Sequence, residues 1–191
     1  MSQRIRTFVA VPLDEPVRCA AVEVIGRLRS AGADVKWVEP EHLHVTLKFL
    51  GEVDRQRIDG ICAAVRDAAA GCAAFELRVQ GAGAFPDLRR PRTLWLGATR
   101  GVEQITTLAG QIESRLAELG FDRERRPFHP HVTVGRLRRA GAATGRLTAL
   151  LREQADTDFG TTGVREVVVF SSHLSPSGPR YEPLAHAPLR A

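Results

Sequence analysis

The chain has 191 residues, of which 43% are hydrophobic and 26% are charged, a balance that fits one globular domain and excludes a disordered or collagen-like chain. The net charge of +5 comes almost wholly from arginine, whose guanidinium group suits phosphate contacts, although a solvated basic surface needs no ligand. Because the apolar run at residues 8–13 is far shorter than the ~20 residues of a membrane-spanning helix, we expect no membrane association and a cytoplasmic location.

The first half of the chain reads as strand, helix, strand, helix and strand. Strands are predicted from runs of β-prone apolar residues, and helices from apolar residues that recur three or four positions apart. The predicted elements are strands at residues 5–13, 42–50 and 75–80 and helices at residues 17–28 and 54–65.

The strand at residues 42–50 alternates strictly between apolar and polar side chains, so one of its faces should lie against the core. The predicted core face holds Leu43, Val45, Leu47 and Phe49, and the opposite face holds His42, His44, Thr46 and Lys48.

The second half repeats this order of elements. Strands are predicted at residues 93–98, 129–137 and 164–170, helices at residues 105–119 and 147–151, and a last strand at residues 181–184. An offset of 87 residues, the separation of His44 and His131, places most elements on their counterparts. The sequence therefore predicts one domain over residues 1–191 with an internal repeat, approximately 1–85 and 92–185. The glycine- and proline-rich residues 81–92 are the predicted boundary between two lobes.

Nearly the same hexapeptide occurs at equivalent places in the two halves, HLHVTL at residues 42–47 and HPHVTV at residues 129–134. In a strand, the second histidine and the threonine of each hexapeptide share one face, about 7 Å apart, and the valine between them faces the core. If the halves pack about a pseudo-twofold axis, His44, Thr46, His131 and Thr133 meet in one site.

Two imidazoles that face each other with two hydroxyls between them suit phosphoryl transfer. In-line displacement at phosphorus needs a base on one side and an acid on the other. Imidazole serves in both roles near neutral pH, because its unperturbed pKa is about 6.5. The hydroxyls can donate to the non-bridging oxygens as charge develops on them. This scheme requires no metal and no cofactor.

The remaining histidines have weaker claims to a site. His42 and His129 flank the motifs and can simply support them, and His173 and His186 have no motif around them. The two His-x-His pairs could together give a metal ion four imidazole ligands, but no Asp or Glu lies beside them and the threonines would have no role. The odd number of cysteines, without Cys-x-x-Cys spacing, argues against a disulfide framework and a thiolate metal site.

At these residues the chain resembles the two-histidine (2H) phosphoesterase superfamily, which is defined by two His-x-Thr-x motifs, here at residues 44–47 and 131–134. More closely, it is similar to the bacterial and archaeal RNA 2′,3′-cyclic phosphodiesterases, also called 2′-5′ RNA ligases. The likeness covers essentially the whole chain and includes four further segments. They are RTFVA at 6–10, KFLGE at 48–52, PRTLWLG at 91–97 and RPFHPH at 126–131.

The resemblance implies an α+β fold of two lobes related by a pseudo-twofold axis, with antiparallel sheets that line a central cleft and helices outside. It implies hydrolysis of RNA 2′,3′-cyclic phosphate ends, or of a small cyclic nucleotide, to 2′-phosphomonoesters. His44 would be the proton donor and His131 the proton acceptor, whereas Thr46, Thr133 and Arg136 would bind phosphate. Strict alternation turns Arg136 away from the motif face, so a bulge or the end of the strand must redirect it.

Two other functions stay open at this point. The reverse reaction, 2′-5′ RNA ligation, can use the same histidines, and a non-catalytic protein could bind RNA ends through its arginines. Intact histidines and threonines in both motifs favour an enzyme, which we expect to act as a monomer. Phe128, Trp37 and Tyr181 could stack a base, but a core position suits each of them better.

Overall fold

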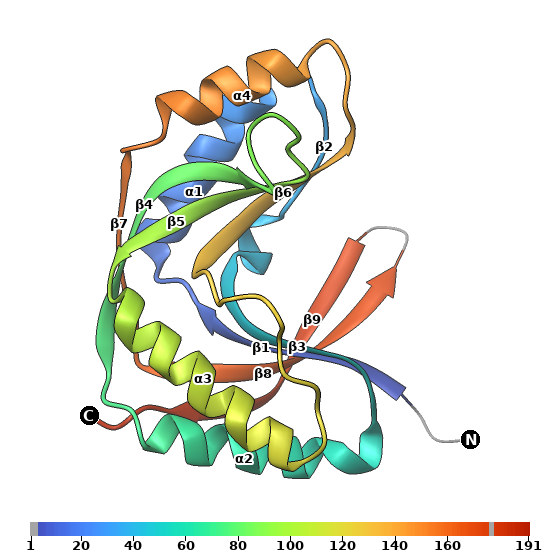
Figure 1. The fold of residues 1–191 in the computed structure, drawn as a ribbon, viewed down its shortest axis with the longest axis vertical. Coiled ribbons are helices and arrows are strands. Elements are labelled where there is room, and N and C mark those ends of the chain that lie inside the picture. Colours follow the sequence, from blue (N-terminus) through green and yellow to red (C-terminus); the bar gives the residue numbers. More distant parts are fainter. Residues whose placement is uncertain (1–3, 176–177) are drawn as a thin grey trace.

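The strands form one curled sheet, and the helices lie outside it (Figure 1). The computed structural model describes residues 4–175 and 178–191, and within them nine strands form the sheet β7-β4-β5-β6-β3-β1-β8-β9, with β2 paired to β6. Neighbouring strands run antiparallel throughout this described sheet. The predicted α+β class is therefore confirmed.

The bounds of the elements follow the apolar runs of the sequence, with turns between them. The strands are β1 (Arg4–Pro12), β2 (Asp34–Trp37), β3 (His44–Asp54), β4 (Phe75–Phe85), β5 (Thr93–Arg100), β6 (His131–Arg139), β7 (Asp158–Val164), β8 (Glu166–Ser175) and β9 (Gly178–Pro188). The helices are α1 (Glu15–Arg29), α2 (Ile58–Ala70), α3 (Val102–Glu118) and α4 (Thr144–Glu153). Two 3-10 turns, η1 (Pro40–His42) and η2 (Arg55–Arg57), precede β3 and α2.

The two sides of the sheet meet at β3 and β6, the strands that carry the motifs. Val45 of β3 pairs with Val132 of β6, and this is the registered pair between the two strands. The strands β5, β4 and β7 continue the sheet beyond β6, and β1, β8 and β9 continue it beyond β3. The two predicted sheets are thus joined into one at the centre of the molecule.

The amphipathic stripes of the helices form the interface between helices and sheet. Val17 and Leu28 of α1 and Ile105 and Ile112 of α3 are at most 1% exposed. Full burial of such a side chain contributes roughly 1.5–3 kcal/mol, so each helix lies where its stripe covers the apolar face of the sheet. As Figure 1 shows, α1 and α4 pack together at one end of the molecule, and α2 and α3 at the other.

Residues 81–92 form the end of β4 and the turn of the β4–β5 hairpin, which corrects the prediction that they link two lobes. Strand β4 runs on to Phe85, where the sequence predicted an end at residue 80, and Phe85 pairs with Thr93 of β5. The glycines that suggested a linker instead belong to the strand. The Trp95 ring packs directly on Gly83, where a Cβ atom would lie only 2.4 Å from the ring, so a residue without a side chain is needed there. The internal repeat itself stays a prediction.

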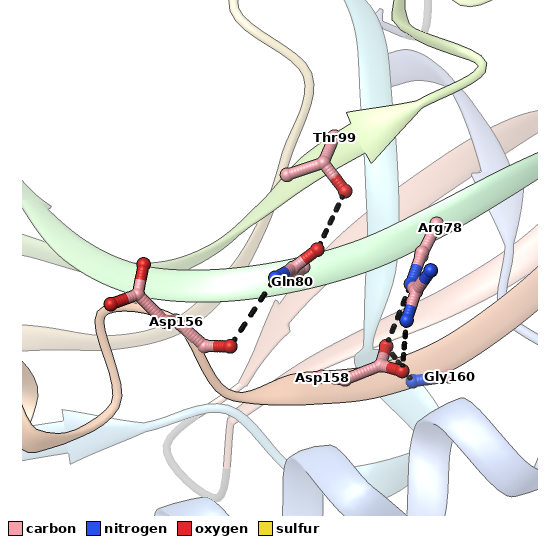
Figure 2. Close-up of polar contacts among 6 residues, drawn as sticks. All are labelled: Arg78, Gln80, Thr99, Asp156, Asp158 and Gly160. Carbon is pink, nitrogen blue, oxygen red and sulfur yellow. Dashed lines mark hydrogen bonds and ion pairs between the residues drawn. The ribbon is translucent and has the colours of Figure 1, made fainter.

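Two strands were not predicted from the sequence. Strand β2 has four residues and lies at an edge, where it pairs with β6. Strand β7 pairs with β4, and Figure 2 shows the polar contacts that hold this edge. Arg78 donates from Nε and Nη2 to the Asp158 carboxylate at 3.2 and 2.7 Å, and Gln80 donates to the Asp156 carbonyl at 3.3 Å. Such edges are defined by tertiary pairing and not by a local apolar pattern.

Candidate active site

The first motif begins where the turn η1 meets β3. His42 ends the turn and donates its N–H to the Glu39 carbonyl at 2.9 Å, so it precedes the strand and is not part of it as predicted. In the second half, β6 likewise begins at His131 and not at His129. Pro130 explains this boundary, because proline has no N–H to offer to a strand ladder.

Both motif histidines are held in the same way. The Nδ1 atom of His44 lies 2.7 Å from the His42 carbonyl oxygen, and that of His131 lies 2.7 Å from the His129 carbonyl oxygen. A carbonyl oxygen only accepts, so each Nδ1 carries the hydrogen and donates it. Each Nε2 is therefore left to take up or release a proton. In neutral His44, the Thr46 hydroxyl donates to Nε2 at 3.0 Å.

The pairing of β3 with β6 brings the two motifs together. Val45 is opposite Val132 in an antiparallel pair, so the histidine and threonine that flank each valine lie on the face opposite the two valines. Charge on His131 is one of the causes that lower the pKa of His44, which places the two imidazoles near each other.

Matching β-bulges follow the two motifs. Val9 and Ala10 of β1 pair with Lys48 and Thr46, which leaves Leu47 as the extra residue of β3. On β6 the extra residue is Val134, because Leu94 and Trp95 of β5 pair with Gly135 and Thr133. Each bulge reverses the alternation of the residues that follow it.

The bulge in β6 turns Arg136 toward the site, which is one of the two ways that the sequence allowed. The Arg136 Nη1 atom donates to the Thr93 hydroxyl at 3.2 Å, and the guanidinium is exposed. Its positive charge is one of the causes that lower the pKa of His131, which places it near that imidazole. Thr93 is a site neighbour that the sequence did not suggest.

The bulge in β3 exchanges the predicted faces of two residues. Phe49, predicted to be in the core, is 50% exposed, and Lys48, predicted to lie beside the histidines, is only 5% exposed. The alternation fails at Leu47 because two residues of β3 oppose one residue of β1. The site therefore gains an aromatic ring and loses an ammonium group relative to the prediction.

Aromatic rings surround the imidazole of His44. Phe8 stacks on it with ring centroids 5.0 Å apart, and Tyr181 contacts it edge-on at 5.7 Å. Burial among these rings lowers the pKa of His44 to about 4, only partly offset by its hydrogen bond to the His42 carbonyl. Positive charge on His42 or His131 lowers this pKa further. His44 is therefore neutral at pH 7 in the free protein.

His131 has a similar environment on the other side of the site. The Phe85 ring meets it edge-on at 5.0 Å, and Trp95 packs against Phe85 at 5.3 Å. Burial is the main cause that lowers the pKa of His131, the hydrogen bond to the His129 carbonyl opposes it, and charge on His129 and Arg136 adds to it. Both motif histidines therefore favour the neutral form.

The structure separates the three aromatic residues that were possible stacking groups. Trp37 and Phe128 are half-buried and pack against the hydrophobic core, as predicted. Tyr181 instead contacts the rings of His42 and His44, with centroids 4.6 and 5.7 Å away. Sequence reasoning missed this contact because Tyr181 comes from β9, far along the chain.

No three His, Cys, Asp or Glu side chains gather as a metal-binding group within residues 4–175 and 178–191, so the four-imidazole arrangement does not form there. Across the same residues, every helix is too short or too polar to cross a bilayer.

Lys48 joins the first motif strand to the loop that leads into the second motif. Its buried Nζ donates to Glu113 Oε1 at 2.8 Å and to the Asp122 carbonyl at 2.7 Å, and Glu113 also accepts from the Glu124 N–H at 2.6 Å. Burial would raise the pKa of the Glu113 carboxyl, but these two donors outweigh it and hold the pKa below its usual range. The loop before His131 is thereby fixed to β3 and α3.

We expect Lys48→Met to lower the free energy of unfolding by about 2–4 kcal/mol, because it leaves Glu113 charged and half-buried without its cation. Lys36→Met is the matched control, since the only other lysine of the chain is exposed on β2 and should change stability by less than about 0.5 kcal/mol. Urea unfolding of both variants measures the difference. Equal midpoints for the two variants would contradict the structural role of Lys48.

A family model described as "2′-5′ RNA ligase superfamily" matches residues 16–174 of the chain. The chain belongs to this superfamily, which confirms the resemblance inferred from the motifs.

Relatives of nearly the same length make the relationship more specific. A protein of Methanothermobacter thermautotrophicus named RNA 2′,3′-cyclic phosphodiesterase is 38% identical over 178 residues, 93% of this chain and 95% of the relative. One of the same name from Archaeoglobus fulgidus is 35% identical over 179 residues, 94% of this chain and 97% of the relative. The crystal structure of the protein TT0787 of Thermus thermophilus is similar with a TM-score of 0.82 and 30% identity, covering 97% of this chain and 98% of that one.

Proposed function

We propose that the protein hydrolyses RNA 2′,3′-cyclic phosphate ends to 2′-phosphomonoester ends. The observation that carries this proposal is the pair of equivalent His-Thr groups on adjoining strands, each with an imidazole whose Nδ1 hydrogen is held by a backbone carbonyl. The name RNA 2′,3′-cyclic phosphodiesterase, carried by relatives that match over nearly the whole chain, supports the same substrate class.

In this reaction a water oxygen attacks phosphorus in line with the P–O3′ bond. His131 Nε2 takes the proton of the attacking water, and the protonated Nε2 of His44 gives its proton to O3′ as the P–O3′ bond breaks. The product carries a 2′-phosphate and a 3′-hydroxyl. Proton exchange with solvent then returns the two imidazoles to their starting states.

The environment of His44 suits a proton donor. With a pKa of about 4, its protonated form is a strong acid that readily protonates a leaving alkoxide. Thr46 and Thr133 share the face of the histidines two residues before them, where their hydroxyls can donate to non-bridging oxygens. Arg136, turned toward the site by the bulge, adds a charged donor for the same oxygens.

Ligation can use the same groups, with a ribose 5′-hydroxyl in place of water as the nucleophile. His131 would take the proton of that hydroxyl and His44 would protonate O3′ as the P–O3′ bond breaks, which leaves a 2′-5′ phosphodiester. Because water is present in large excess over any hydroxyl end, hydrolysis is the dominant direction. Cytoplasmic location and action as a monomer stay predictions.

The direct test is incubation with an oligoribonucleotide that ends in a 2′,3′-cyclic phosphate, in buffer that contains EDTA. We expect complete conversion to a 2′-phosphate end, identified by phosphorus NMR, with no loss of rate relative to buffer without EDTA. A 3′-phosphate product would reverse the leaving group assigned here. Loss of the activity in EDTA would show that the two imidazoles are not sufficient.

A further inference from the structure

Phe49 presents an exposed aromatic face beside the motif histidines. It is directly paired with Phe8 across β3 and β1, and their ring centroids are 5.6 Å apart. Phe8 in turn stacks on His44, so all three rings lie on the same face of the sheet. Half of the Phe49 side chain is open to solvent, whereas Phe8 is only 2% exposed. The exposed half of the Phe49 ring is available to stack on another ring.

The repeat offset gives Phe49 a functional counterpart. Residues 47 and 134 are the extra residues of the two bulges, and residues 49 and 136 follow them at the same distance. Each bulge therefore delivers one long side chain to the site, an arginine from β6 and a phenylalanine from β3. A guanidinium suits a phosphate group, and an aromatic ring suits a nucleobase.

Arginines continue along the same face of β1. Side chains two residues apart in a strand share a face, so Arg4 and Arg6 lie on the side of Phe8, at intervals of about 6.6 Å. Both are exposed. Burial raises the pKa of the Tyr181 phenol, and the charges of Arg136 and Arg6 oppose this, which places both arginines near that ring. Arg6 is thus next to the rings that surround His44.

Strands β1 and β8 separate at the positions of these arginines. Strand β8 pairs with β1 only from Thr7 to Ala10, so residues 4–6 of β1 separate from β8. A cavity of about 780 Å³ lies in this split, with α2 as its floor. Its lining includes four arginines and three carboxylates, and one of the carboxylates, Glu182, is already paired with Arg180 and His173 at 3.1 and 3.6 Å. His44 and His131 are not among the residues that line the cavity.

We propose that this face of β1 and β3 binds the end of a single RNA strand, an inference that rests on the proposed function. The base of the terminal nucleotide stacks on Phe49, and the phosphates on its 5′ side contact Arg6 and then Arg4 on the way to the split between β1 and β8. The interval between the two arginines is comparable to the spacing of consecutive phosphates in an extended strand. Arg6 and Arg4 have Glu52 and Asp54 of β3 as their direct cross-strand partners, just as Arg138 of β6 faces Asp34 at 3.9 Å. The observation that favours the β1 side is the exposed ring of Phe49, because the β6 side presents no exposed aromatic ring among the described residues.

The test compares two substrates, adenosine 2′,3′-cyclic phosphate and a five-nucleotide RNA that ends in a 2′,3′-cyclic phosphate. Only the longer substrate has phosphates for Arg6 and Arg4. We expect Arg4→Ala/Arg6→Ala to lower the ratio of kcat/KM for the RNA to kcat/KM for the mononucleotide about tenfold. The salt dependence of KM for the RNA should weaken by about 0.7 log units per log unit of salt for each arginine removed.

Arg27→Ala/Arg29→Ala is the matched control, because it removes the same charge from exposed positions at the end of α1. It should leave the substrate ratio at the wild-type value. A ratio within twofold of wild type in the Arg4/Arg6 variant, or an equal fall in the control, would overturn the assignment of the phosphate contacts. Wild-type protein that hydrolyses neither substrate would overturn the proposed function, and this inference with it.

Phe49 is tested with the mononucleotide, which carries the base that it stacks. We expect Phe49→Leu to raise KM about tenfold with little change in kcat, and Phe49→Trp to restore the wild-type KM, because stacking on an aromatic face is tolerant of the ring. Equal KM values for the leucine and tryptophan variants would exclude stacking at this position.

Discussion

His44→Ala and His131→Ala are each expected to lower kcat by about 10²–10⁴, the usual contribution of one general acid or base. Each imidazole is held at Nδ1 by a backbone carbonyl that the substitution leaves in place, so the loss falls on the proton transfer at Nε2. The measurement is single-turnover hydrolysis of an RNA 2′,3′-cyclic phosphate end. Both variants should keep the wild-type circular dichroism spectrum, because the substitutions leave the backbone pairing of β3 and β6 with their neighbours in place.

His186→Ala serves as the control for removal of a histidine. This residue is exposed on β9 and pairs with Glu166, so its variant should turn over substrate at the wild-type rate. Activity within tenfold of wild type in either motif variant would contradict acid-base catalysis by the pair.

The two motif variants should also differ from each other with an activated substrate. A nitrophenyl phosphodiester has a leaving group that needs no proton, so loss of the acid matters less for it than loss of the base. We expect His44→Ala to recover most of its activity on this substrate and His131→Ala to recover little. The opposite pattern would exchange the two roles.

The residues that we propose for this chemistry could be selected from the sequence because they are local and repeated. Each histidine and its threonine are two positions apart in a strand, and the second copy at residues 131–133 repeats the first. Period-2 geometry then places each pair on one face of its own strand without knowledge of the fold. The helices were predictable for a similar reason, since stripes such as Val17 to Leu28 depend only on spacing within one element.

The residues around the histidines depend on pairing between strands and could not be predicted in the same way. A bulge at Leu47 is a property of how β3 lies against β1, and it reverses the faces predicted for Lys48 and Phe49. Tyr181 reaches His44 because β9 pairs with β8 and β8 pairs with β1. No spacing rule in the sequence predicts such a contact. The residues that set the pKa values of the two motif histidines could therefore be identified only from the fold.

These surroundings predict a shifted pH dependence for kcat/KM. Catalysis needs one imidazole protonated and the other neutral, so activity rises as the first proton leaves the pair and falls as the second leaves. The pKa of His44 is lowered to about 4 and that of His131 is also lowered. Both pKa values of the resulting bell-shaped pH profile, one for its acid limb and one for its alkaline limb, should therefore lie below 6.5. At pH values above the alkaline limb, kcat/KM should fall about tenfold for each pH unit.

Bound substrate should move this profile toward higher pH. The cyclic phosphate carries a negative charge, which favours the protonated form of an imidazole beside it and raises the pKa of both histidines. Because kcat reports the complex and kcat/KM reports the free enzyme, the optimum for kcat is expected at a higher pH than the optimum for kcat/KM. Coincident optima would show that the phosphate does not lie between the two imidazoles.

The contribution of His44 to the acid limb can be tested through Tyr181, whose ring helps to bury that imidazole. Tyr181→Ala admits water and weakens the main cause of the low pKa of His44, so the acid limb should move from near pH 4 to higher pH, as far as the lowered pKa of His131 allows. Tyr181→Phe keeps the ring and should leave the limb where it is. The pH dependence of kcat/KM for a cyclic mononucleotide measures both. An acid limb that coincides in the alanine, phenylalanine and wild-type proteins would mean that burial beside Tyr181 does not control the proton on His44.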